Sequence, residues 1–118
     1  MSAKKLAEVL KMKFHSNLVW CGEALIKVWE KQTAVEQEYK ITKVQNGVGF
    51  SAHDAEFGTK LAEIALAWKA NPKGFKSPYG PKMAPWAVKF ACRYAGQVAR
   101  MMIEEKPEAA EKLLANAG

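Results

Sequence analysis

Apolar residues recur three and four positions apart along most of this chain, which is the spacing of helices with one buried face. Long amphipathic helices are expected over residues 2–14, 16–31, 51–70 and 81–105. Ser2, Ser16 and Ser51 are suited to cap the first three, because their hydroxyls can accept hydrogen bonds from free backbone N–H groups. Pro81 is a suitable first residue for the last, although Pro85 favours a later start or a slight kink.

Shorter helices are expected where a cap signal lies outside these stretches. Thr33 and Glu36 have the spacing of a capping box, which predicts a new short helix to about Tyr39. Lys106 and Pro107 should end the last long helix and begin a short terminal one, because proline is favoured in a first turn. We therefore predict an all-α fold, a compact bundle of four to five helices.

Residues 40–50 differ from the helical pattern. They are rich in β-branched residues, and Asn46-Gly47 is a strong tight-turn signal because both residues tolerate a positive φ. This segment is expected to form a glycine-containing turn, as a minimal hairpin or a structured loop. It is not a phosphate-binding loop of the lysine-containing type, because the glycine spacing is wrong and the lysine and hydroxyl pair is missing.

Composition agrees with one helical domain over residues 1–118, since 49% of the residues are hydrophobic and 25% are charged. No apolar run approaches the roughly 18 residues that a membrane span needs. Cys21 and Cys92 each lie in an apolar helical pattern, which is typical of reduced, buried cysteines in a cytoplasmic protein.

Charge is distributed very unevenly. Residues 69–100 hold seven of the basic residues and no acidic one, so the formal net charge of +6 arises in this stretch. Phe75, Tyr79 and Trp86 are interleaved with these cations. Such a segment favours a surface that binds a polyanion, nucleic acid above all. The alternative is a solvated face that only keeps the protein soluble.

Helical geometry places part of this charge on one side of the last long helix. At about 100° per residue, one stripe within about 60° contains Lys82, Trp86, Lys89, Arg93, Gln97 and Arg100. The preceding segment 71–81 is rich in proline and glycine and is expected to be a functional loop. The candidate binding residues are Lys73, Phe75, Lys76, Tyr79, Lys82, Trp86, Lys89, Arg93 and Arg100.

The glycine turn is a second candidate contact. Asn46, Gly47 and Gly49 could bring backbone amides close to a phosphate. We favour the simpler interpretation, in which the glycines only permit the turn and Phe50 fills the core.

Catalytic machinery is not evident in the sequence. His53 and Asp54 are adjacent on an expected helix, so their side chains point about 100° apart and do not face each other. No paired acid and base, activated nucleophile or metal-ligand cluster stands out, and we expect a binding protein without metal or cofactor.

Three segments together resemble a known small module: Gln32-Thr33-Ala34-Val35-Glu36-Gln37, then Asn46-Gly47-Val48-Gly49-Phe50-Ser51-Ala52-His53-Asp54-Ala55, then Pro81-Lys82 leading to Arg93-Tyr94-Ala95-Gly96-Gln97. The module occurs in phage, plasmid and prophage proteins, alone or appended to helicase-like proteins. Because the module is found with helicase-like proteins, the resemblance implies, by association, a role with nucleic acid inside a bacterial host cell. This chain departs from the family pattern at Tyr79-Gly80 and Met83, where relatives carry Leu-Thr and Gln.

Two functions remain open at this point. The first is a small accessory protein of a phage or mobile element that binds nucleic acid, with single-stranded DNA slightly favoured. The second is a protein-binding inhibitor of a host defence or DNA-processing complex, which would use the same basic face against an acidic or nucleic-acid-binding protein. The sequence does not indicate the oligomeric state.

Overall fold

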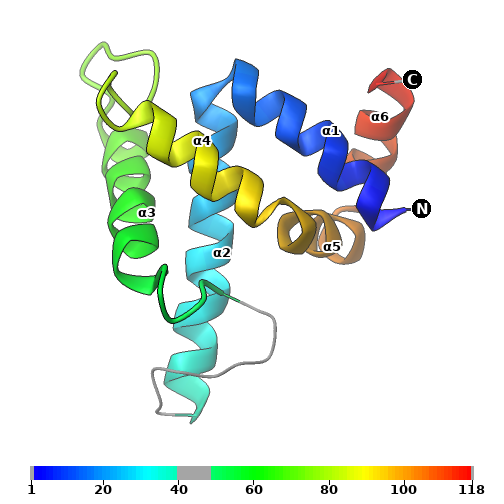
Figure 1. Cartoon of the computed structure of the whole chain (residues 1–118), viewed down its shortest axis with the longest axis horizontal. Coiled ribbons are helices and arrows are strands. Elements are labelled where there is room, and N and C mark those ends of the chain that lie inside the picture. Colours follow the sequence, from blue (N-terminus) through cyan, green and yellow to red (C-terminus); the bar gives the residue numbers. More distant parts are fainter. Residues whose placement is uncertain (1, 40–48, 118) are drawn as a thin grey trace.

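The backbone of residues 2–39 and 49–117 is described in a computed structural model, and within these residues it forms six α-helices and no strand. The helices are α1 Ala3–Ser16, α2 Leu18–Tyr39, α3 Ala55–Ala70, α4 Ala84–Arg93, α5 Ala95–Glu105 and α6 Pro107–Ala117 (Figure 1). The predicted all-α class is confirmed, but the helix count exceeds the predicted four to five. The turn or hairpin predicted at 40–50 lies almost wholly outside the described residues.

The first two helices meet at Asn17 and not at Ser16. Ser2 caps α1 as predicted, since its Oγ accepts a hydrogen bond from the Lys5 N–H at 3.2 Å. Asn17 leaves the helical region and ends α1, and its Oδ1 accepts from the Val19 N–H at 2.9 Å at the start of α2. The amide side chain therefore satisfies a donor that the new helix would otherwise leave unpaired.

The prediction of a separate short helix beginning at Thr33 is wrong, because α2 continues without interruption to Tyr39. No glycine or proline occurs between Gly22 and Gly47, so nothing in the local sequence ends the helix at Lys31. A capping-box spacing is also compatible with a helix interior.

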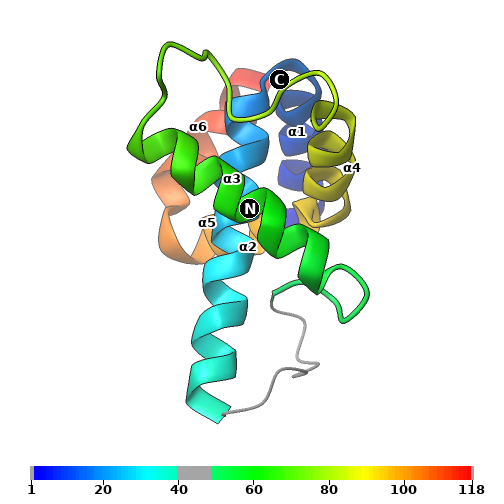
Figure 2. The ribbon, with the colours of Figure 1, turned by 90° about the vertical axis from the view of Figure 1, so that its left-hand side faces the viewer.

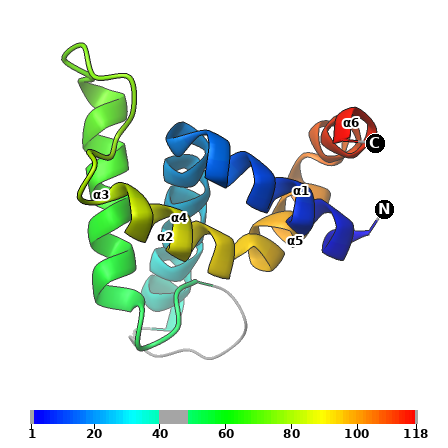
Figure 3. The ribbon, with the colours of Figure 1, turned by 45° about the horizontal axis from the view of Figure 1, so that its top comes forward.

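The prediction of a single long helix over residues 81–105 is also wrong. Its first part, α4, begins only at Ala84, with Pro85 in the first turn, which is the later start that Pro85 favoured. The helix breaks at Tyr94 (φ −102°, ψ 10°), and α5 leads away from the line of α4 (Figures 1 and 3). This break adds a helix and divides the predicted basic stripe.

The core lies where α2 is surrounded by its neighbours. α2 packs against α3, α4, α5 and α1, while α1 also packs against α5 and α6 (Figures 1 and 2). The largest fully buried side chains are Phe14, Leu6, Leu10, Leu25, Leu61, Val28 and Cys21. Burying each large aliphatic or aromatic side chain contributes roughly 1.5–3 kcal/mol. None of the helices in the described part of the chain is long and apolar enough to cross a membrane.

Candidate nucleic-acid interface

The loop between α3 and α4 is fixed to the body of the protein by Tyr79. This side chain is only 3% exposed, and its hydroxyl donates a hydrogen bond to the Leu61 carbonyl of α3 at 2.7 Å. Burial raises the pKa of the Tyr79 hydroxyl, so it keeps the proton that it donates. Tyr79 is therefore an anchor inside the protein, and the expectation that its ring is available to a ligand is wrong.

The tip of the same loop points away from the core. The Phe75 N–H donates to the Pro72 carbonyl at 2.9 Å, closing a tight turn in which Lys73 and Gly74 have φ values of 50° and 85°. The Trp68 indole N–H donates to the Phe75 carbonyl at 2.9 Å and holds the tip against α3. Phe75 is 70% exposed, with Lys73 and Lys76 exposed beside it.

The loop leads directly into α4 (Figure 2). A second exposed ring and further exposed lysines lie at this junction. Trp86 is 46% exposed and packs on Phe57 of α3, with ring centroids 5.6 Å apart. The Lys89 Nζ lies 5.3 Å from the Trp86 ring, which is a cation–π distance. Lys82 and Lys89 are both exposed.

We call the exposed cations and rings of this loop and of α4 the basic-aromatic surface: Lys73, Phe75, Lys76, Lys82, Trp86 and Lys89. Among the described residues, none of its four lysines is in an ion pair. Their charges are therefore available to an anionic ligand. The sequence identified all six residues, because exposed cations without nearby acids are visible in composition.

Arg93 has a different environment from the four lysines. Its Nη1 donates to both carboxylate oxygens of Asp54, at 2.7 and 2.8 Å. The Tyr94 hydroxyl donates to the Asp54 Oδ2 at 2.7 Å. Burial alone would raise the pKa of Asp54, but the hydrogen bonds from Arg93 and Tyr94 and the Arg93 charge outweigh it and lower this pKa. Asp54 is thus an ionised, buried carboxylate.

Arg100 is not part of the same surface. It is exposed, but it lies on α5, beyond the break at Tyr94. The predicted continuous line of cations from Lys82 to Arg100 therefore does not exist.

The turn before α3 is held by internal hydrogen bonds. The Gly49 N–H donates to the Gln97 Oε1 at 2.7 Å, and the Gln97 Nε2 donates to the Gly49 carbonyl at 3.2 Å. The Phe50 N–H donates to the Gln32 Oε1 at 3.0 Å. The Gly49 N–H is already hydrogen-bonded within the protein and is not free to contact a phosphate, which agrees with the simpler interpretation favoured for the glycine turn. Asn46 and Gly47 lie outside the described residues.

Phe50 and Tyr94 complete this arrangement. Phe50 is 7% exposed, and its ring meets Tyr94 edge-on with centroids 5.1 Å apart. The Ser51 N–H donates to the Tyr94 hydroxyl at 2.9 Å. Phe50 therefore fills the core, as the simpler interpretation of the glycine turn required, and Gly49 adopts the positive φ of 82°.

A polar network thus joins residues that are distant in the sequence: Gln32, Gly49, Phe50, Ser51, Asp54, Arg93, Tyr94 and Gln97. All of them occur in the segments on which the family resemblance rests. The sequence alone did not predict their mutual contacts, because hydrogen-bond partners 18 to 48 residues apart leave no local signal. That these three segments stood out together in the sequence was the one available clue.

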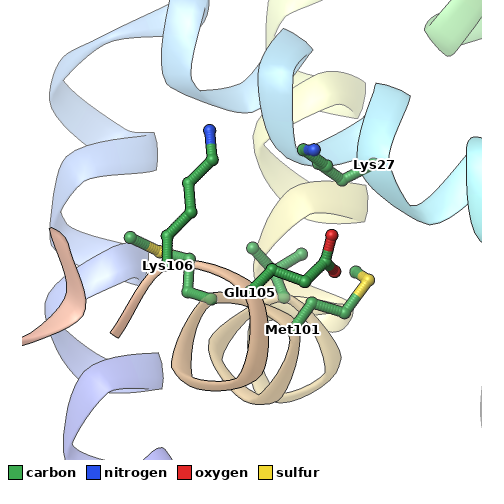
Figure 4. Close-up of a pocket in the computed structure, with 6 residues that line it drawn as sticks. Lys27, Met101, Glu105 and Lys106 are labelled. Atoms are coloured by element: carbon green, nitrogen blue, oxygen red, sulfur yellow. The ribbon is translucent and has the colours of Figure 1, made fainter. Parts of the chain in front are cut away.

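A small hollow lies between α2 and α5, on other elements than the basic-aromatic surface (Figure 4). Its cavity volume is only about 30 Å³, it is partly open to solvent, and it is lined by Lys27, Val98, Met101, Met102, Glu105 and Lys106. Glu105 pairs with Lys31 at 3.4 Å. The lining offers no acid and base in contact.

Cys92 and His15 are the one thiol and imidazole pair that the described residues bring close. The Cys92 Sγ lies 3.9 Å from the His15 Nδ1, which is 2.8 Å from the Lys11 carbonyl. Since a carbonyl can only accept, the Nδ1 carries a proton and cannot take one from the thiol. Burial also raises the pKa of Cys92. Within the described residues there is no group of three or more potential metal ligands.

Comparison with known proteins adds no relative: no family model, no curated protein and no solved structure matches the chain.

Proposed function

We propose that this chain is a small accessory protein of a phage or mobile element that binds nucleic acid through the basic-aromatic surface. It acts by binding and not by catalysis. Lysines neutralise backbone phosphates, and the two exposed rings stack on bases. Because bases in a duplex are already stacked on each other, exposed rings favour single-stranded nucleic acid, and single-stranded DNA is the first ligand to test.

One observation carries this proposal: two large aromatic rings remain exposed among four lysines without an ion pair in the described structure. Phe75 is 70% and Trp86 46% exposed, although ordinary folding would bury rings of this size. A purely solvated face would need the lysines but not the rings. The combination is typical of surfaces that bind single strands.

The backbone at Lys73 supports the same conclusion. Its φ of 50° lies in the left-handed region, which costs a residue other than glycine roughly 1 kcal/mol. The protein is less stable with lysine than it would be with glycine at this position. A role of the lysine charge in binding accounts for a residue that local stability disfavours. Residues in such conformations cluster at functional sites.

The test is a salt-titrated binding measurement with oligo(dT), a DNA duplex and an RNA single strand. The double variant Lys82→Glu and Lys89→Glu should lose nearly all binding to oligo(dT). Phe75→Ala and Trp86→Ala should each weaken it by roughly 1–3 kcal/mol if the rings stack on bases. Each phosphate contact removed should lower the slope of log affinity against log salt by about one.

Lys4→Glu with Lys5→Glu is the matched control, because it changes the net charge equally. These two lysines are exposed at the start of α1, at the far end of the molecule from the loop (Figures 1 and 3). Equal losses in both double variants would mean that net charge alone drives association. If no form of nucleic acid binds at low salt, the proposal is wrong, and an inhibitor that docks on an acidic host protein becomes the function to test.

A further inference from the structure

We propose that Arg93 is a positioning contact for one phosphodiester group, held in a fixed orientation by Asp54. This inference rests on the proposed function and extends it to a residue that differs in kind from the lysines. The lysines supply mobile charge. Arg93 supplies two hydrogen bonds in a set direction.

The geometry leaves the required donors free. Both of the hydrogen bonds that Arg93 donates to Asp54 come from its Nη1 atom. A guanidinium has five N–H donors, of which Nη1 carries two, so three remain on Nη2 and Nε. Within the described residues these two nitrogens donate to no protein group, and the Arg93 side chain is 45% exposed. The Nη2 and Nε edge of the fork matches two oxygens of a phosphate.

The guanidinium is constrained from two sides. Its Cζ lies 5.2 Å from the centre of the Phe90 ring, which supports the plane of the group. Asp54 itself is 6% exposed and is held by the Tyr94 hydroxyl at 2.7 Å. A long side chain that is already ordered loses less rotational freedom when a ligand binds.

Arg93 also lies where a strand that crosses the basic-aromatic surface would meet it. It is four residues after Lys89 and seven after Trp86 on α4, so all three are on neighbouring turns of one face, within about 10 Å along the axis. Beneath this face Phe57 links Trp86 to Phe90, with ring centroids 5.6 and 5.2 Å apart. A base stacked on Trp86 would place a neighbouring phosphate toward Arg93.

The Asp54→Asn variant tests this inference, because the direction of the change in affinity distinguishes an oriented Arg93 from one that acts only as a charge. Removing an acid from a basic face should tighten binding if Arg93 acts only as a charge. If Asp54 orients Arg93, binding to oligo(dT) should instead weaken by about five- to tenfold, because the fork is no longer held. Tighter or unchanged binding would refute this inference.

Arg93→Lys and Lys89→Gln separate orientation from charge. The first keeps the positive charge but removes the fork, so we expect about fivefold weaker binding with an unchanged salt slope. The second should lower the salt slope by about one. If Arg93→Lys binds as wild type does, the inference is wrong. If it weakens only oligonucleotides that contain guanine, Arg93 contacts a base edge and the phosphate assignment is wrong.

Loss of stability is controlled with Val28→Ala, which removes buried volume from the core and changes no residue of this face. Val28 is fully buried in α2. At a temperature where circular dichroism shows every variant folded, Val28→Ala should bind as wild type does. An equal loss in Val28→Ala and Asp54→Asn would trace the effect to the fold and overturn the inference. Absence of binding by the wild-type protein would instead refute the proposed function itself.

Discussion

At the scale of single residues, Asp54 has a different role from the one that its position suggests. It directly precedes α3, where a carboxylate would stabilise the N-terminal end of the helix through the dipole. Its side chain makes no cap hydrogen bond and turns instead to Arg93 and Tyr94. A charged group in a buried position is stable only with such partners, and here they come from another part of the chain.

This environment predicts how stability depends on pH. The pKa of Asp54 is lower in the folded protein than in the unfolded chain, so its contribution is present above about pH 4 and is lost as the pH falls through the folded pKa. Asp54→Asn should lower the free energy of unfolding at pH 7 by about 1–3 kcal/mol. Its disadvantage should shrink as the pH falls below about 4, toward the lowered pKa of the folded carboxyl.

Urea unfolding at pH 7, 4 and 3 measures this difference. Glu8→Gln serves as the comparison, because Glu8 is exposed and its ion pair, with Lys11 at 3.6 Å, is on the surface. That change should stay within about 0.5 kcal/mol of wild type. A constant gap between wild type and Asp54→Asn at all three pH values would contradict the assigned role.

At the scale of elements, the position of α3 depends on one glycine. Gly58 faces the Phe50 ring, and a Cβ built at Gly58 would lie 2.8 Å from three atoms of that ring. Phe50 is buried and packed on Tyr94, so it has little room to move. The close approach of α3 to the residues before it therefore requires the missing side chain at position 58.

Two glycine-to-alanine changes should have opposite effects. Gly58→Ala should destabilise the fold by about 1–3 kcal/mol, because overpacking outweighs the better helix propensity of alanine. Gly96→Ala in α5 should stabilise it by up to about 1 kcal/mol, since the nearest atom to its Cβ is the Arg100 guanidinium at 3.8 Å. Thermal melts and urea unfolding report both. A stabilised Gly58→Ala protein would show that Phe50 can move aside.

At the scale of the whole molecule, Cys21 reports on the integrity of the core. It is fully buried, and its Sγ donates to the Phe14 carbonyl at 3.2 Å. Burial, with a smaller contribution from Cys92, raises its pKa to about 12. Both cysteines are free, and Cys92 is half-buried. The thiolate is the reactive form, so Cys21 should react only when the protein opens.

In a Cys92→Ser background, a thiol reagent should modify Cys21 at least about a thousandfold more slowly than it does in the unfolded chain. The rate should rise with urea in parallel with loss of the circular dichroism signal. Rapid labelling without denaturant would show that the core around α1 and α2 opens locally.

Much of the fold follows from local patterns in the sequence. The helical character of most of the chain, the Ser2 cap, the end of α3 before Asn71 and the start of α6 at Pro107 were predicted, because periodicity and capping depend on neighbours within about four residues. The expected Ser51 cap was not found, since α3 begins at Ala55 with Asp54 before it. The exposed lysines and rings of the basic-aromatic surface were also identifiable, since charge clustering is a property of composition.

Tertiary contacts decided the rest. The sequence around Tyr94 reads as one continuous helix, and the chain bends there while the Tyr94 hydroxyl is bonded to Asp54 and Ser51, about 40 residues earlier. The same contacts separate Arg100 from the surface and convert Arg93 from a free cation into an oriented one. Tyr79 was expected at the surface and is buried because Leu61 accepts its hydrogen bond. Partners so far apart in the chain leave no trace in local periodicity, so only the folded structure shows which cations and rings remain available to a ligand.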